Sequence, residues 1–173
     1  GLKRLLSYLE KFGIGELTGI DLQGEAPAPL RTPDSWYPID LATASFGQGI
    51  SITPLQLITA VNAIANGGIL LRPQVVSEII TEDGKKIAIK PESRGRVIKP
   101  ATAKVMTSIM VDAIEQGESQ WVKIKIYKIA GKTGTAQIPV AGHYDPSQTI
   151  ASFVGFLPAD KPKITILVLI DRP

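Results

Sequence analysis

The segment Lys128-Ile129-Ala130-Gly131-Lys132-Thr133-Gly134-Thr135-Ala136-Gln137 decides how this chain is interpreted. It brings together a lysine, two threonine hydroxyls and a glycine, directly after a run that contains Ile124, Ile126 and Tyr127 with lysines between them. β-Branched and aromatic residues that alternate with charges favour a strand with one solvated face. We therefore expect residues 124–138 to form a strand that carries these side chains on extended backbone.

Three interpretations of this segment stay open on the residues alone. A Walker phosphate loop needs a glycine five residues before Gly131, but Ile126 stands there and no glycine-rich loop precedes it. The Lys-Thr-Gly element of the penicillin-recognising serine acyltransferases needs a fixed positive charge, hydroxyls that hold a carboxylate, and a glycine against which substrate can lie. The third interpretation is an ordinary exposed strand with a glycine bulge, which a match of three residues does not exclude.

Composition limits the classes of function. With 173 residues, 44% of them hydrophobic, the chain can bury a core in one domain or most of one. Nineteen Lys and Arg residues against 16 Asp and Glu give a net charge of +3 that is spread along the chain, so we expect no nucleic-acid partner. The absence of cysteine excludes disulfides, thiolate zinc sites and cysteine nucleophiles, and it suits an extracytoplasmic protein.

No apolar run approaches the roughly eighteen residues of a membrane helix, so we expect no membrane-spanning segment within these 173 residues and no signal peptide at their start. Residue 1 begins inside a helical pattern, so we expect the chain to be part of a longer one. The proline-rich residues 23–40 are expected to be irregular.

Hydrophobic periodicity predicts three helices and a hairpin in the first two thirds of the chain. One amphipathic helix is expected over 2–12, and Thr53-Pro54 opens a core helix that runs to Asn66. Asp83-Gly84 between Ile/Val-rich runs predicts a hairpin. Lys99-Pro100 opens the third helix. Its apolar stripe consists of Val105, Met106, Ile109, Met110 and Ile114.

The last third predicts an antiparallel meander of three strands, over 124–138, 149–157 and 163–170. Its final strand is apolar at nearly every position, so we expect it inside a sheet that is covered on both faces, and not at an edge. Residues 139–148 are expected to form a polar loop. His143 in that loop has no second ligand in sequence, so we expect a solvated histidine and no metal site.

Four segments in order resemble the transpeptidase domain of class B penicillin-binding proteins. The segments are Lys11 to Leu22, Phe46-Gly47-Gln48-Gly49 through Gly67-Gly68, Ala130 through Gln137, and Phe153-Val154-Gly155-Phe156 with Pro158. The resemblance implies an α/β fold of the α+β type, in which an antiparallel sheet is flanked by helices, as in serine β-lactamases. Residues 1–173 would be the C-terminal part of a single transpeptidase domain.

The resemblance also implies a function and roles for individual residues. A serine would be acylated by the penultimate D-Ala of a peptidoglycan stem peptide and deacylated by an amino group of a second strand. Lys132 would supply positive potential, Thr133 and Thr135 would hold the terminal carboxylate, and the N–H of Thr135 would form half of the oxyanion hole. Gly134 would keep the strand flat, and Gln137 would complete the substrate-binding set. No cofactor is implied.

The departures from the family pattern are equally informative. No serine between residues 1 and 173 has lysine three positions on or asparagine two positions on, so neither the Ser-x-x-Lys nor the Ser-x-Asn motif is present. We therefore expect a serine-type enzyme in the parent protein and an inactive fragment here, without the nucleophile and without the helix that ends the domain. Residues 117–120 also differ from the family's usual Gly-Thr-Ala.

Two classes of function stay open at this point: a D,D-transpeptidase, or a non-catalytic sensor or scaffold that keeps the fold for penicillin binding. The expected partners are peptidoglycan stem peptides, β-lactam antibiotics and the cell-wall synthesis machinery. Residues 163–171 are expected to pair with the N-terminal half of the domain or with a second copy. The implied location is the extracytoplasmic face of the bacterial cytoplasmic membrane, with an anchor outside this chain.

Overall fold

The computed structural model describes residues 1–117, 122, 124, 126–140 and 143–173, and for residues 139, 140 and 143–147 it describes the backbone alone. The described elements are helices and antiparallel sheets, in agreement with the expected class. In chain order they are α1 (Leu2–Lys11), η1 (Pro33–Ser35), α2 (Pro38–Ala44), α3 (Pro54–Ala65), β1 (Ile69–Leu71), β2 (Glu78–Ile80), β3 (Lys86–Ala88), β4 (Ser93–Arg96), α4 (Pro100–Glu115), β5 (Ala130–Val140), β6 (His143–Leu157) and β7 (Ile164–Asp171).

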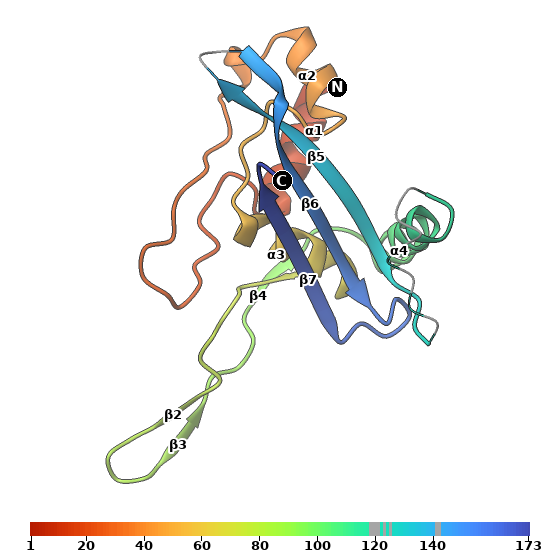
Figure 1. Ribbon diagram of the computed structural model, residues 1–173. Helices are drawn as coiled ribbons and strands as arrows, with labels where there is room; N and C mark the ends of the chain where they lie inside the picture. The colour runs from red at the N-terminus through yellow and green to blue at the C-terminus, as the bar shows by residue number, and fades with distance from the viewer. Residues whose placement is uncertain (118–121, 123, 125, 141–142) are drawn as a thin grey trace.

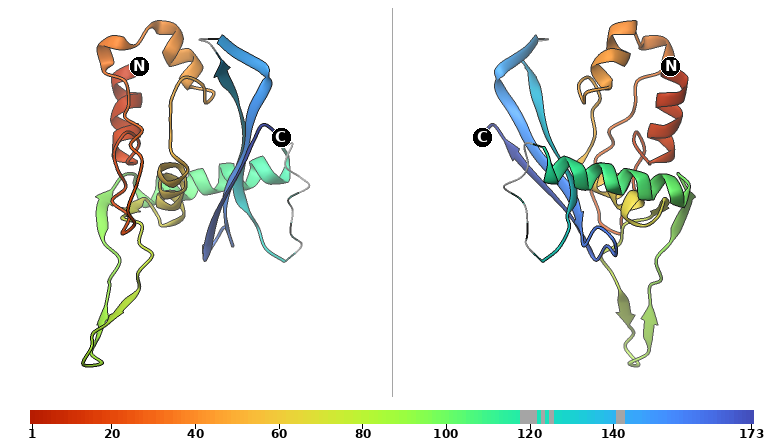
Figure 2. Two further views of the ribbon diagram at one scale, coloured as in Figure 1. Left: turned by 60° about the vertical axis from the view of Figure 1, so that its left-hand side comes forward. Right: turned by 90° about the vertical axis from the view of Figure 1, so that its right-hand side faces the viewer.

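The main sheet is the predicted antiparallel meander, with strand order β5-β6-β7. Its long strands run side by side in Figure 1. Helices α3 and α4 pack against one face of this sheet, while α1 stands apart from it (Figure 2). The sheet and the two helices are therefore the frame that positions the Lys-Thr-Gly segment.

A small core fixes the beginning of β5. Met110 of α4, Ala130, Phe156 and Ala159 form one buried cluster, and Ala130 and Phe156 are both 0% exposed. Partly buried side chains of α3 and α4 pack around it, namely Val61, Ile64, Ala65 and Val111. Because Ala130 is held in this cluster, Lys132 follows it at a fixed place, two residues further along the strand.

Helix α3 has the predicted cap and is tied to its neighbours by buried polar groups. Thr53 Oγ1 accepts a hydrogen bond from the N–H of Gln56 (3.1 Å), and Gln56 Oε1 accepts one from the N–H of Thr53 (3.0 Å). This reciprocal pair is a capping box. Gln56, only 2% exposed, also donates from Nε2 to the carbonyl of Glu16 (2.7 Å), and Thr165 donates from Oγ1 to Asn62 Oδ1 (2.9 Å). Helix α3 thus connects the N-terminal segment to β7.

The predicted hairpin is formed by β2 and β3, which pair in antiparallel register and project away from the body (Figure 1). Its base is held by Asp21, whose carboxylate accepts hydrogen bonds from the N–H groups of Val75 (2.7 Å) and Val76 (2.8 Å). These backbone donors, that of Val76 first, hold the pKa of the Asp21 carboxyl below its usual value.

None of the described helices is both long enough and apolar enough to cross a membrane.

The boundaries predicted around β5 were wrong in two places. The strand begins at Ala130 rather than at residue 124, because Ile124 forms an isolated bridge with Tyr127 and does not join the ladder with β6. The expected polar loop over 139–148 is largely strand. After a register shift between Gln137 and Ile138 the ladder continues, because backbone pairing does not depend on how polar the side chains are.

The prediction that the last strand is an inner strand covered on both faces was also wrong for the described residues. Strand β7 pairs with β6 alone, and the helices cover one sheet face only. Five of its apolar side chains are at least 40% exposed: Ile164, Ile166, Val168, Leu169 and Ile170. The described part of the chain therefore leaves an apolar edge and an apolar face open to solvent.

Two helices also differ from expectation. Residues 38–44 form α2, which begins inside the stretch expected to be irregular, because Pro38 occupies its first turn and the Asp40 carboxylate accepts a hydrogen bond from the N–H of Tyr37 (2.7 Å). In α4, Met110 and Ile114 are buried as expected, but Val105 and Ile109 are more than half exposed. The helix is therefore covered along only part of its apolar stripe.

Candidate active site

Strand β5 displays the predicted site residues on two faces. Side chains alternate along a strand, so Lys132 and Gly134 share the face of buried Ala130, while Thr133 and Thr135 share the opposite face. Lys132, Gly134, Thr135 and Gln137 are exposed and Thr133 is partly buried. A ligand can therefore reach the lysine and both threonines together only along the open edge of the strand.

The direction of the backbone groups follows from one hydrogen bond at the end of the sheet. The N–H of Arg172 donates to the carbonyl of Thr149 (2.9 Å), so the polar backbone groups of Thr149 point toward β7. Since successive residues of a strand point their backbone groups in opposite directions, those of Ser152 point toward β5 and meet Gly134, its partner in register. The N–H and C=O of Thr135 therefore point away from β6, toward the open edge of β5.

The lysine reaches the same edge. Lys132 donates from Nζ to the carbonyl of Thr133 (2.8 Å), and that carbonyl points outward by the same alternation. The ammonium group thus lies close to the edge along which the N–H of Thr135 is directed. This arrangement can present a positive charge, hydroxyls and a backbone donor to one anionic or carbonyl-bearing ligand.

Ser152 is a residue at this site that the sequence interpretation missed. It lies directly opposite Gly134, and its Oγ donates to the carbonyl of Gly134 (3.3 Å). A Cβ atom added at Gly134 would lie 2.7 Å from this oxygen, so the glycine is needed for the approach of Ser152 as well as for a flat strand. The only sequence signal was the position of Ser152 immediately before the Phe153-Val154-Gly155-Phe156 motif.

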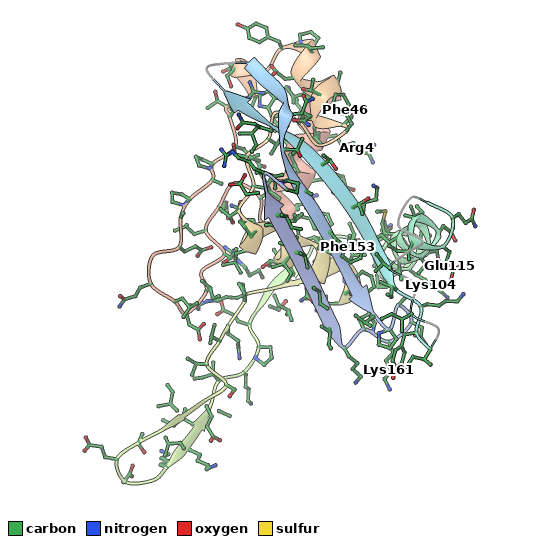
Figure 3. The ribbon with its side chains drawn as sticks, in the orientation of Figure 1. Arg4, Phe46, Lys104, Glu115, Phe153 and Lys161 are labelled. Carbon is green, nitrogen blue, oxygen red and sulfur yellow. The ribbon has the colours of Figure 1, made fainter. Side chains whose placement is uncertain are left out.

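Phe153 lies midway along the sheet (Figure 3), and its ring packs over Gly131 of β5 and Gly155 of β6. A Cβ atom added at Gly131 would lie 2.7 Å from Cζ of Phe153, and one at Gly155 would lie 3.2 Å from its Cε1. The ring therefore fills the space that these two glycines leave on the face of Thr133 and Thr135.

Two hollows of the molecule do not include the edge of β5, and two stretches noted in the sequence fall partly outside the described residues. One hollow is bounded by α3, α4 and residues 159–162, and another by residues 126–128 and 157–164, but neither is lined by Lys132 or the threonines. The side chain of His143 and most of the divergent stretch 117–120 lie outside the described residues. Among the residues that the structure describes, no group of three His, Asp or Glu side chains is placed to hold a metal ion.

Comparison with known proteins identifies the family. The model of the penicillin binding protein transpeptidase domain matches residues 1–173. The chain belongs to this family, and its relatives are class B penicillin-binding proteins.

Two curated relatives and one solved structure illustrate the similarity. Stage V sporulation protein D of Bacillus subtilis is 38% identical over 175 residues, which cover 100% of this chain and 27% of that protein. The probable peptidoglycan D,D-transpeptidase PenA of Neisseria meningitidis is 32% identical, with 100% and 28% covered. Penicillin binding protein 3 of Mycobacterium tuberculosis, in complex with aztreonam, superimposes with a TM-score of 0.94 at 31% identity, covering 100% of this chain and 41% of that one. The chain thus spans little more than a quarter of the length of these curated relatives.

Proposed function

We propose that this chain supplies one wall of the active site of a peptidoglycan D,D-transpeptidase, and that residues 1–173 are the C-terminal part of its transpeptidase domain. The family match over the whole chain supports the class of reaction. The relative named a probable peptidoglycan D,D-transpeptidase and the structure holding aztreonam support the substrate and β-lactams as ligands. The parent protein acts at the extracytoplasmic face of the membrane, together with cell-wall synthesis machinery.

The observation that carries the proposal is the open edge of β5. The N–H of Thr135 is directed along it, Lys132 reaches it, and Thr133 and Thr135 flank it from one face. A stem peptide that ends in a carboxylate offers an anion for the lysine and the hydroxyls, and a carbonyl for the backbone donor. An ordinary structural strand needs none of these groups at an unpaired edge.

In the proposed reaction, a serine outside this chain attacks the carbonyl carbon of the penultimate D-Ala. An ester C–O bond forms, the peptide C–N bond breaks, and the terminal D-Ala leaves with the proton that the serine gave up. The amino group of a second stem peptide then attacks the ester, which forms the cross-link and frees the serine. Lys132 stabilises negative charge, Thr133, Thr135 and Gln137 position the substrate, and the N–H of Thr135 stabilises the oxyanion. One such donor is worth roughly 3 kcal/mol of barrier, about a hundredfold in rate.

Because the proposed nucleophile lies outside this chain, a β-lactam should react only with the complete protein. Incubation with a penicillin should give a stoichiometric acyl adduct on the complete protein and none on residues 1–173 alone, because no Ser-x-x-Lys nucleophile lies in this chain. Intact-mass measurement, followed by peptide mapping of the adduct, checks both results. An adduct on any residue of this chain would contradict the assignment. An adduct without cross-linking of stem peptides by the complete protein would favour a sensor over a transpeptidase.

The bare edge of β7 predicts a partner strand. Burying an apolar side chain is worth roughly 1.5–3 kcal/mol, and an unpaired edge is a template for another chain. We propose that residues 163–171 pair with the N-terminal half of the domain or with a second copy, and that the isolated chain otherwise aggregates. Light scattering of residues 1–173 alone should therefore report dimers or larger particles.

Amide exchange gives this prediction an internal control. By the alternation of the ladder, the N–H groups of Thr165, Leu167 and Leu169 point to the open edge, whereas those of Ile166 and Val168 point to β6. Addition of the N-terminal half should protect the first group and leave the second nearly unchanged. A stable monomer whose three outward amides exchange fast with and without the N-terminal half would contradict the pairing.

A further inference from the structure

The hydroxyl of Ser152 reaches the peptide group between Gly134 and Thr135, whose N–H is the proposed donor to the oxyanion. Its Oγ lies 3.3 Å from the carbonyl oxygen of Gly134, to which it donates. Apart from Gly134 and its two chain neighbours, no other heavy atom of the described residues lies within 4 Å of the position that a Cβ at Gly134 would occupy, so Ser152 is the neighbour that defines the space over this glycine. The contact comes from the facing strand, at the position directly opposite in register.

The carbonyl of Gly134 and the N–H of Thr135 are the two ends of one planar amide. The carbonyl end points toward β6, where Ser152 lies, and the N–H end points toward the open edge of β5. A donor on the carbonyl therefore acts on the N–H in two ways. It restrains rotation of the peptide plane, and it polarises the amide so that the N–H becomes a stronger donor.

We propose that Ser152 is a positioning residue for acylation, which holds and polarises the Gly134–Thr135 peptide so that the N–H of Thr135 meets the developing oxyanion. This role rests on the proposed function. Ser152 does not touch the substrate and exchanges no proton with it. The contribution is specific to the transition state, because the oxyanion needs a donor that is already oriented before charge develops.

Ser152→Ala removes the hydroxyl without adding bulk, and Ser152→Thr restores it. Ser108→Ala is a matched control, because Ser108 Oγ also donates to a backbone carbonyl, that of Lys104, at 3.3 Å, but on α4. In the complete protein, Ser152→Ala should lower the rate constant of acylation by a penicillin about fivefold, the size of one neutral hydrogen bond, with the dissociation constant of the preceding complex changed less than about twofold. Ser152→Thr and Ser108→Ala should both react at nearly the rate of the wild-type protein.

Two spectroscopic measurements separate positioning from a merely structural role. The infrared stretch of the acyl-ester carbonyl should move to higher wavenumber in Ser152→Ala, because the oxyanion-hole donor is weaker, and return in Ser152→Thr. Gly134-Thr135 is the only Gly-Thr pair among the 173 residues. Labelling glycine carbonyls with ¹³C and threonine amides with ¹⁵N therefore gives one cross-peak from this chain, which should shift in Ser152→Ala and stay in place in Ser108→Ala.

The outcomes distinguish this inference from the proposed function. A wild-type protein that forms no acyl adduct would overturn both. Normal acylation of the wild type together with an unchanged rate in Ser152→Ala, or an unmoved Thr135 cross-peak, would overturn the role of Ser152 alone. A slower Ser152→Ala with an unshifted ester carbonyl, or one that Ser152→Thr does not rescue, would also overturn it.

Discussion

Lys132→Ala in the complete protein should slow acylation by a β-lactam about a hundredfold or more, which is the usual cost of removing one group that stabilises transition-state charge. Lys132 is exposed, and its Nζ hydrogen-bonds to the carbonyl of Thr133 at the edge of the sheet. Removing an exposed side chain usually changes the free energy of unfolding by less than about 0.5 kcal/mol. The rate should therefore collapse while thermal unfolding stays nearly unchanged.

Lys128→Ala is the matched control for this prediction. Lys128 is also exposed and lies four residues earlier, outside β5, where its Nζ lies 4.0 Å from Glu115. Stopped-flow acylation of both variants should give a large loss for Lys132→Ala and a rate close to that of the wild type for Lys128→Ala. Equal rates in the two variants, with folding intact, would contradict a role for Lys132 in acylation.

Phe156→Ala should lower the free energy of unfolding by about 3–5 kcal/mol, because the ring is completely buried and its removal leaves a cavity. In the complete protein the melting temperature of the transpeptidase domain should fall by several degrees. The same substitution at Phe46, which is 70% exposed, should cost far less. Thermal and denaturant unfolding of the two variants tests the placement of Phe156 in the core against which β5 begins. Similar losses in both variants would show that this placement is wrong.

The local signals that predicted the fold correctly were those that depend on backbone chemistry. Thr53-Pro54 marked the start of α3, because a threonine hydroxyl can cap the orphan N–H groups and proline fits the first turn. Asp83-Gly84 marked the hairpin, and the glycine has the positive φ of 79° that this turn uses. Both signals act within a few residues, so sequence alone carries them.

The features that sequence could not supply depend on partners distant along the chain. Strand β5 begins at Ala130 because α4 and Phe156 bury that residue, and Ile124 and Tyr127 look equally strand-like by type. Ser152 enters the site only through its register with Gly134, eighteen residues earlier. Lys132, Thr133, Gly134, Thr135 and Gln137 were predicted as site residues, but their common edge follows from the direction of the ladder.

The covering of Gly131 and Gly155 by Phe153 restricts the mutational paths open to the sheet. Alanine at either glycine would place a methyl carbon against the aromatic ring, and at Gly155 also against the carbonyl of Ala130. Loss of the ring alone would remove the side chain that packs over both glycines. The three positions therefore constrain one another, because a side chain at either glycine requires that the ring of Phe153 move or be replaced.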